Sequence, residues 1–246
     1  MSNNRYLREF HSNLDTNERI VIFPHAGGSA SYYFQLSRVL KKELSPSVVQ
    51  YPKRAERLRD IGVETLQKLA TEVVDELVAD DRPLHVLGHS MGALVAWEVA
   101  QILDRHPGTE LKTLFVSGCA SPHRVSFESV NAEDDISLVE EISRLSGTDS
   151  SLLSDPAVLE MVLPALRHDY ALLSAYIPSA TERISSRIVA YSGDNDPLAP
   201  PAAVQHWHAL TRNSFEMRVF PGTHFYLREH NAAVGEDILA RSAGAQ

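Results

Sequence analysis

The sequence predicts an α/β protein in which helices cover both faces of a mostly parallel central sheet. Short apolar runs alternate with amphipathic runs of helical period along most of the 246 residues. Such alternation implies right-handed crossovers between parallel strands. An all-helical stretch interrupts the alternation between about residues 121 and 180. We therefore expect a single domain over residues 1–246, with a helical lid inserted at about 121–180.

Six runs have the composition of buried strands, and three amphipathic segments follow the first three of them. The predicted strands are 19–23, 48–51, 83–87, 111–116, 187–191 and 215–220. The predicted helices are 31–42, 64–79 and 92–105. The third helix carries almost no charge in its first turns, which predicts that it is buried against the sheet.

The interruption contains two helical patterns and no strand pattern. Leu138, Ile142 and Leu145 recur at i, i+4 and i+7. Asp155 followed by Pro156 has the form of an N-cap with proline at the first helical position. The apolar positions behind this start are 159, 162, 163 and 166.

Composition excludes several classes of protein. A net charge of −9 disfavours a nucleic-acid-binding protein, which would carry a basic surplus. The single cysteine, Cys119, rules out an internal disulfide and a CxxC site, and it fits a reducing compartment. The first 18 residues are polar, and no apolar run approaches the ~20 residues that cross a bilayer. We therefore expect a cytoplasmic protein without a membrane span.

The segment Gly88 to Gly92 matches G-x-S-x-G, with Ser90 at its centre. A predicted strand ends at Leu87, and a helix of small residues begins after Ser90. In this context the serine occupies a strained turn between strand and helix and acts as a nucleophile. The alternative is an ordinary turn with a solvated serine.

A nucleophilic serine needs a base and an acid that orients the base. In the α/β-hydrolase arrangement the chain order is serine, then aspartate or glutamate, then histidine. Asp194 and Asp196 follow the fifth predicted strand, and His224 follows the sixth. Spacing favours Asp196 as the orienting acid, with Asp194 as the alternative. For His224 the alternative is a loop histidine packed on Phe225.

The tetrahedral intermediate of acyl transfer needs hydrogen-bond donors for its oxyanion. One expected donor is the backbone N–H of Met91, the residue directly after the nucleophile. The second is expected from the loop after the first predicted strand, through the N–H of Ala26. His25 in the same loop is either a functional contact or a polar residue at the rim.

Other residues that could carry chemistry give weaker signals. His85 and His89 straddle a strand and a turn, and the side chains of His206 and His208 diverge on a helix, so we expect no metal site. No phosphate-binding or dinucleotide-binding motif is present, and no cofactor is expected. The basic run at positions 53, 54, 57 and 59 is either a solvated face or a docking patch.

Four motifs together resemble the type II (editing) thioesterases of polyketide synthases and nonribosomal peptide synthetases. They are F-P-H-A-G-G-S, G-H-S-M-G-A-L-V-A-W-E-V-A, G-D-N-D-P-L and F-P-G-T-H-F-Y-L, and the similarity runs from about residue 18 to 240, including L-R-H-D-Y in the insertion. One departure is visible: members of this family usually have a P-G-R-G-like turn where this chain has P-K-R-A at residues 52–55. The departure concerns the shape of one loop rather than the chemistry.

The resemblance implies hydrolysis of acyl thioesters on the phosphopantetheine arm of acyl or peptidyl carrier proteins, which removes stalled or mis-primed chains. It implies Ser90 as nucleophile, His224 as general base and Asp196 as its orienting acid, with Ala26 and Met91 as oxyanion donors. Contact with the carrier protein is expected to be transient, and the enzyme is expected to be a monomer.

Three other functions use the same residues or the same scaffold. A small-molecule carboxylesterase or lipase would use an identical serine, histidine and aspartate. An acyltransferase would pass the acyl group to a nucleophile other than water. The alternative that is not an enzyme is a binding protein on a hydrolase scaffold. The intact order of Ser90, Asp196 and His224 argues against it, because a binding protein does not need all three residues.

Overall fold

The computed structural model describes residues 5–11, 13, 15–125, 131–146, 155–179 and 182–244. Its centre is a seven-stranded sheet with the order β1-β3-β2-β4-β5-β6-β7. Only β1 pairs antiparallel, with β3, and the other neighbours are parallel. The strands are β1 (Leu7–Arg8), β2 (Arg19–Phe23), β3 (Ser45–Val49), β4 (Leu84–His89), β5 (Leu111–Ser117), β6 (Arg187–Gly193) and β7 (Phe215–Phe220).

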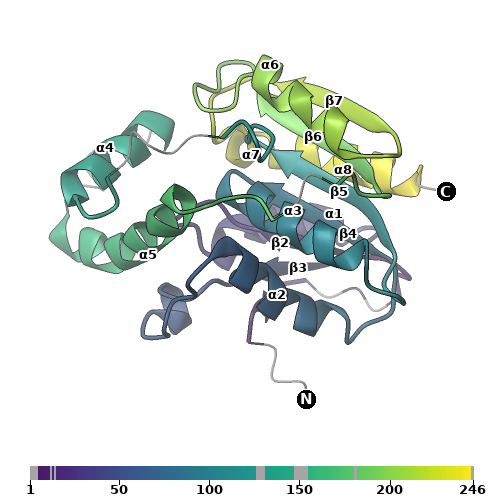
Figure 1. Ribbon diagram of the computed structural model, residues 1–246, viewed down its shortest axis with the longest axis horizontal. Helices are drawn as coiled ribbons and strands as arrows, with labels where there is room; N and C mark the ends of the chain where they lie inside the picture. The colour runs from purple at the N-terminus through teal and green to yellow at the C-terminus, as the bar shows by residue number, and fades with distance from the viewer. Residues whose placement is uncertain are drawn as a thin grey trace.

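Helices cover both faces of this sheet, as predicted (Figure 1). The α2 (Leu66–Leu77) and α3 (Met91–Leu103) helices pack together on one face. On the other face lie α1 (Phe34–Leu40) and α8 (Asn231–Ala243). The α3 helix is buried along nearly its whole length, which explains its apolar first turns.

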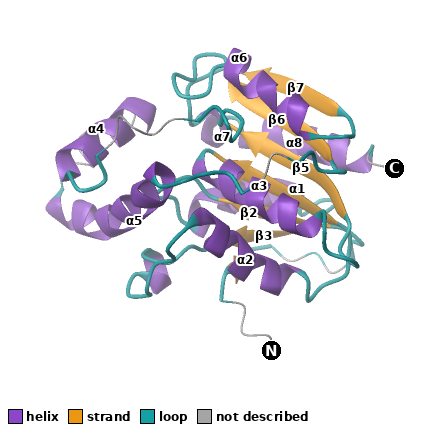
Figure 2. Ribbon diagram, viewed as in Figure 1, coloured by secondary structure: helices purple, strands orange, loops and turns teal. Residues whose placement is uncertain are grey.

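The predicted helical insertion consists of α4 (Asp135–Ser146) and α5 (Pro156–Ser174), which lie between β5 and β6 in the chain. Figure 2 shows both helices beyond one end of the strands. The α5 helix begins at Pro156, directly after Asp155, as its sequence predicts. Leu138 of α4 is fully buried, whereas the side chains of Ile142 and Leu145 lie outside the described part of the chain. Within the described residues no helix combines the length and apolarity needed to cross a membrane.

The strand predictions are confirmed, with shifts at some ends. Strands β2 and β7 have the predicted bounds, whereas β3 begins and ends earlier than the predicted 48–51 because Ser45 and Pro46 also join the sheet. The sequence patterns do not predict β1, nor three helices near the C-terminus: α6 (Pro201–Val204), α7 (Tyr226–Glu229) and α8. Residues 205–210 form a 3-10 helix rather than an α-helix.

Candidate active site

Ser90 lies in a sharp turn between β4 and α3. Its φ of 54° and ψ of −121° are backbone angles that side-chain-bearing residues rarely adopt, and they store strain of order 1–3 kcal/mol. The backbone N–H of Ser90 donates to the carbonyl oxygen of Ser117 at 2.8 Å, which ties the turn to β5. Ser90 remains partly exposed, whereas its neighbours on both sides are buried. The turn therefore presents one hydroxyl at the end of the sheet.

The glycines on either side of Ser90 are needed for space. A Cβ atom on Gly92 would lie 1.9 Å from the carbonyl oxygen of Phe23, and a Cβ atom on Gly88 would lie 2.2 Å from the carbonyl oxygen of Gly92. These distances involve backbone atoms, which cannot move aside without displacing β2 or α3. Both glycines of the motif are therefore fixed by packing of the helix against the strand.

His224 and Asp196 meet at the same end of the sheet. Nδ1 of His224 lies 2.8 Å from Oδ2 of Asp196, and both side chains are buried. The other carboxylate oxygen of Asp196 accepts from the N–H groups of Leu198 and Ala199 at 2.9 and 3.1 Å. In the tautomer whose Nδ1–H donates this hydrogen bond to Asp196, the imidazole has a free lone pair on Nε2. This Nε2 atom is buried and has no hydrogen-bond partner among the described residues.

The surroundings of Asp196 keep it ionised. Burial by itself raises the pKa of the carboxyl, but the hydrogen bond from His224, the electrostatic interaction with that ring and the two backbone N–H groups outweigh burial. The pKa of Asp196 is therefore lowered. A charged aspartate at this position favours a proton on Nδ1 of His224 and stabilises the imidazolium.

Asp194, the alternative acid, makes different contacts. Its side chain accepts from the backbone N–H of Gly222 at 2.8 Å and from the side chain of Asn195 at 2.8 Å. The residue is exposed. Asp194 thus holds the loop after β6 against the loop after β7, whereas the hydrogen bond to His224 comes from Asp196.

The two expected oxyanion donors are both available as backbone N–H groups. Met91 is the first residue of α3, where backbone N–H groups have no acceptor within the helix. In the loop after β2, three of four consecutive N–H groups are engaged: His25 donates to Tyr33, Gly27 to Asp169 and Gly28 to the carbonyl oxygen of His25. The remaining N–H, that of Ala26, has no hydrogen-bond partner in the described part of the protein.

Two further histidines lie close to His224. The ring of His89 is 5.1 Å from the ring of His224, and His25 is 6.0 Å from His89. Nδ1 of His89 is paired with the Ser117 hydroxyl at 2.9 Å, and Nδ1 of His25 with the Tyr33 hydroxyl at 2.9 Å. Desolvation, with a smaller effect of the neighbouring histidines, lowers the pKa of both rings. Both rings are therefore neutral near pH 7.

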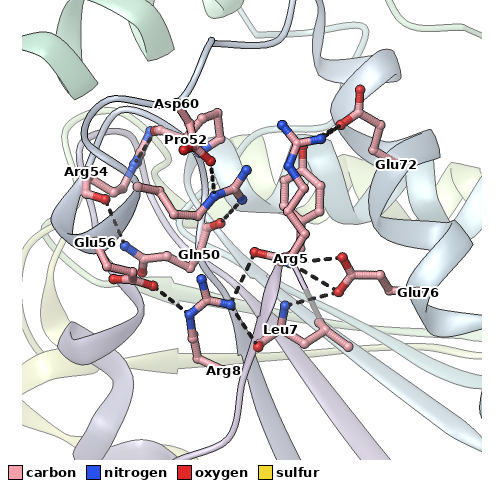
Figure 3. A network of polar contacts seen from close by, with 12 residues as sticks. Arg5, Leu7, Arg8, Gln50, Pro52, Arg54, Glu56, Asp60, Glu72 and Glu76 are labelled. Atoms are coloured by element: carbon pink, nitrogen blue, oxygen red, sulfur yellow. Dashed lines mark hydrogen bonds and ion pairs between the residues drawn. The ribbon is translucent and has the colours of Figure 1, made fainter. Parts of the chain in front are cut away.

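The basic run after β3 is neither a solvated face nor a complete docking patch. Arg54 and Arg57 are buried. Arg57 pairs with Asp60 at 2.7 Å and donates to the carbonyl oxygen of Gln50. Figure 3 shows these two partners, Gln50 and Asp60, close to each other in the loop that follows the end of β3. Of the four basic residues only Arg59 is exposed, and Lys53 is partly exposed. Two of the four charges therefore belong to the structure of the loop.

Three of the other histidines and the single cysteine take no part in the catalytic hydrogen bonds described above. His85 pairs with Glu18 at 2.9 Å, and the rings of His206 and His208 are 6.5 Å apart. No group of three or more possible metal ligands occurs among the described residues. Cys119 is buried, which raises the pKa of its thiol and makes the reactive thiolate scarce.

Sequence patterns did not assign a role to Asp169, which the structure brings to this site from α5. Its carboxylate accepts from the N–H of Gly27 at 2.8 Å, beside the expected oxyanion donor. The only sequence signal was its place in L-R-H-D-Y, in the insertion. Its buried partner Arg54 lies 115 residues earlier in the chain, so the contact is invisible to local patterns.

The strand order, the helices on both faces and the serine at the turn after β4 together define an α/β-hydrolase fold. A lipase-esterase related protein from Clostridium acetobutylicum has the same fold, with a TM-score of 0.72 at 14% identity over 95% of this chain and 98% of that one. This likeness establishes the fold alone.

The family model described as "Thioesterase domain" matches residues 18–241. The chain is 38% identical to thioesterase PikA5 of Streptomyces venezuelae, over 95% of this chain and 84% of that protein. It is 37% identical to a probable cadicidin biosynthesis thioesterase of Streptomyces griseus, over 95% of this chain and 65% of that protein. The chain belongs to the thioesterase family and is a thioester hydrolase, which confirms the resemblance seen in its motifs.

Solved structures agree with this assignment. The type II thioesterase BorB from the borrelidin biosynthetic cluster superposes with a TM-score of 0.86 at 31% identity, covering 96% of this chain and 97% of that one. The thioesterase RedJ from the prodiginine pathway of Streptomyces coelicolor gives a TM-score of 0.80 at 33% identity, covering 90% of this chain and 85% of that one.

Proposed function

We propose that this thioesterase hydrolyses acyl groups from the phosphopantetheine arm of acyl or peptidyl carrier proteins, and so clears stalled or mis-primed chains from a polyketide or nonribosomal peptide synthase. The observation that carries the proposal is the hydrogen-bonded pair His224–Asp196 at the same end of the sheet as the strained Ser90. The Streptomyces griseus relative is named for cadicidin biosynthesis, and BorB and RedJ come from the borrelidin biosynthetic cluster and the prodiginine biosynthetic pathway.

In the proposed mechanism, Ser90 attacks the thioester carbonyl while Nε2 of His224 takes the hydroxyl proton. The N–H groups of Ala26 and Met91 donate to the oxyanion of the tetrahedral intermediate. Loss of one such donor typically costs about 3 kcal/mol of transition-state stabilisation. Asp196 holds the imidazole in the required tautomer and stabilises its charged form. The pantetheine thiol then leaves with the proton from His224.

Water completes the cycle in the proposed scheme. It attacks the acyl group on Ser90 while His224 again accepts a proton, and collapse of the second intermediate frees the acid and the serine. A thiolate is a good leaving group, so the departure of pantetheine from the first intermediate needs little acid assistance. All of these steps use side chains and backbone groups of this chain, and we propose no cofactor.

We propose that the carrier protein binds transiently and that the enzyme works as a monomer in the cytoplasm. Carrier proteins tend to be acidic, and this chain has a net charge of −9, so docking must rely on a local surface. Arg59 is an exposed positive charge near the active-site end of β3, and Ile61 is an apolar side chain with 85% exposure two residues further on. We propose this segment as one part of the docking surface.

The test of the chemistry is the variant Ser90→Ala. It is expected to abolish hydrolysis of an acyl carrier protein or of acyl-pantetheine while the thermal unfolding midpoint stays close to that of the wild type. A serine-directed fluorophosphonate is expected to label the wild type at Ser90 and to leave the variant unlabelled. Full activity in Ser90→Ala would contradict the mechanism.

The substrate class needs a separate comparison of kcat/KM for one acyl chain on a carrier protein, on coenzyme A and in an oxygen ester. The proposal expects the carrier-bound thioester to be preferred. A clear preference for the oxygen ester would favour the carboxylesterase alternative. Transfer of the acyl group to an added amine or alcohol in place of water would favour an acyltransferase.

A further inference from the structure

The loop that carries the expected oxyanion donor, residues 24–30, is held by side chains from other segments. Tyr51 donates its hydroxyl to the carbonyl oxygen of Pro24 at 3.2 Å. Gln50 accepts from the N–H of Ala30 at 2.7 Å. Both residues lie at the end of β3, so the two ends of the loop are fastened to the neighbouring strand.

The centre of the loop is fastened by a buried ion pair. One oxygen of Asp169 accepts from the N–H of Gly27 at 2.8 Å, and the other accepts from Arg54 at 2.6 Å. Arg54 also donates to the carbonyl oxygen of Gly28 at 3.0 Å. The pair therefore binds an N–H and a C=O group of adjacent residues, directly after Ala26.

Both charged side chains are taken almost completely out of water, with exposed fractions of 4% for Arg54 and 1% for Asp169. A buried ion pair adds little stability, because desolvation of the charges offsets their attraction. The residues that flank Arg54 are also in an unfavourable conformation, with φ of 69° at Lys53 and 47° at Ala55. The protein thus accepts strain to place this guanidinium, which indicates a role other than stability.

We infer that Asp169 and Arg54 are positioning residues for the oxyanion hole, an inference that rests on the proposed function. By engaging the N–H of Gly27 and the carbonyl oxygen of Gly28, they hold the turn directly after Ala26. The N–H of Gly28 in turn donates to the carbonyl oxygen of His25, in the peptide group that presents the N–H of Ala26 to the substrate. Arg54 also compensates the carboxylate charge of Asp169, which would otherwise oppose the negative charge that develops on the substrate oxygen. Because Asp169 lies on α5, this contact ties the helical insertion to the catalytic donor.

Two double variants separate positioning from stability. Arg54→Leu/Asp169→Leu removes both buried charges and the acceptor of the Gly27 N–H. Arg54→Gln/Asp169→Asn also removes both charges, but its amide groups can still bond one another and accept from Gly27. Neither variant leaves one buried charge without its partner, a change that strongly destabilises a protein. The comparison therefore isolates the hydrogen bonds to the loop.

We expect kcat of the leucine pair to fall roughly 10- to 100-fold below that of the amide pair, with KM changed by less than about threefold. A small displacement of the donor weakens its hydrogen bond to the oxyanion of the transition state more than it weakens binding of the substrate. Amide hydrogen exchange over residues 24–30 is expected to be faster in the leucine pair. Equal kcat values and equal exchange in the two double variants would overturn the inference.

The matched control is Glu98→Leu. Glu98 is a buried carboxylate on α3 that accepts from Tyr176 and Ser179, just beyond the end of α5, and neither of these hydrogen bonds involves residues 24–30. This variant should lower the thermal midpoint and leave kcat within about twofold. A fall in kcat as large as that of the leucine pair would mean that any loosening of α5 lowers activity, and would also overturn the inference.

If the leucine pair does not fold, Arg54→Lys tests whether the hydrogen bond from Arg54 to the loop positions the oxyanion donor. Lysine keeps the positive charge beside Asp169, but one ammonium group cannot also reach the carbonyl oxygen of Gly28 in the same geometry. A severalfold loss in kcat at constant KM is expected, and unchanged kcat would contradict the role of Arg54. Failure of the proposed function is distinguishable, because the wild type itself would then not hydrolyse carrier-bound thioesters.

Discussion

Nδ1 of His224 lies 2.8 Å from Oδ2 of Asp196, although 28 residues separate the two in the chain. Asp194, only two residues before Asp196, points to the N–H of Gly222 instead. Two positions of one loop, separated by a single residue, therefore carry carboxylates with different partners. Their proposed roles can be separated by matched substitutions.

The variant Asp196→Asn is expected to lower kcat by about 10⁴-fold, the size of effect seen when the acid of a serine-histidine-aspartate triad becomes an amide. The asparagine side chain can donate to Nδ1 of His224, which moves the ring proton to Nε2 and removes the base that Ser90 needs. Steady-state hydrolysis of an acyl thioester checks this result. The control Asp194→Asn keeps an acceptor for Gly222 and should leave kcat within about twofold, and equal losses in both variants would contradict the assignment.

Lys53→Gly and Ala55→Gly are expected to stabilise the protein. Each residue has a positive φ, which costs roughly 1–2 kcal/mol for a side-chain-bearing residue. Glycine removes this strain, but it also gives the unfolded chain more conformational freedom, which lowers the free energy of unfolding by about 0.4–1 kcal/mol. The net gain of about 0.5–1 kcal/mol should raise the thermal midpoint by about 1–4 °C in a protein of this size.

The control for these glycines is Arg59→Gly, at an exposed position without a positive φ in the same loop. There glycine only adds freedom to the unfolded chain, so the midpoint should fall. A fall of the midpoint in Lys53→Gly and Ala55→Gly as well would show that the turn is not strained. Activity of all three variants toward acyl-pantetheine, a substrate without a carrier protein to dock, is expected to match that of the wild type.

The buried ring of His89 should make the free energy of unfolding depend on pH. Desolvation, with smaller contributions from His224 and His25, holds its pKa in the folded protein well below 6.5. Tyr226 and the Ser117 hydroxyl complete its surroundings. The unfolded chain therefore binds a proton below about pH 6.5 that the folded chain does not. As the pH is lowered below this value, the free energy of unfolding falls by up to about 1.4 kcal/mol per pH unit for this group.

In His89→Asn the unfolding free energy should fall less steeply between about pH 6.5 and 5, because unfolding then takes up about one proton fewer. Denaturant titrations at several pH values can measure this slope. The lowered pKa values of Asp169 and Asp196 act only below about pH 4 and do not enter this window. Ser117→Ala is the control, because it removes the hydrogen bond of His89 and keeps the titrating ring. An unchanged slope in His89→Asn would show that this ring gains its proton in the folded state as well.

The sequence predicted the layered fold because each parallel strand and its crossover helix have strong local patterns. The bounds of β2 and β7 followed directly from their apolar runs. Strand β1 could not be predicted in this way, since its two residues become a strand only by pairing with β3. Helix α8 is defined in a similar way by its packing against α1, where Gly235 leaves room for Val39.

By itself the sequence determined the fold class, the position of Ser90 in its turn and the chain order of serine, acid and histidine, because these depend on local residue types and on strand succession. Tertiary structure decided which aspartate meets His224, and that Arg54 and Arg57 turn inward rather than toward a partner. It also brought Asp169 of α5 to the loop of Ala26. These outcomes depend on distances between segments far apart in the chain, which no local pattern of residues encodes.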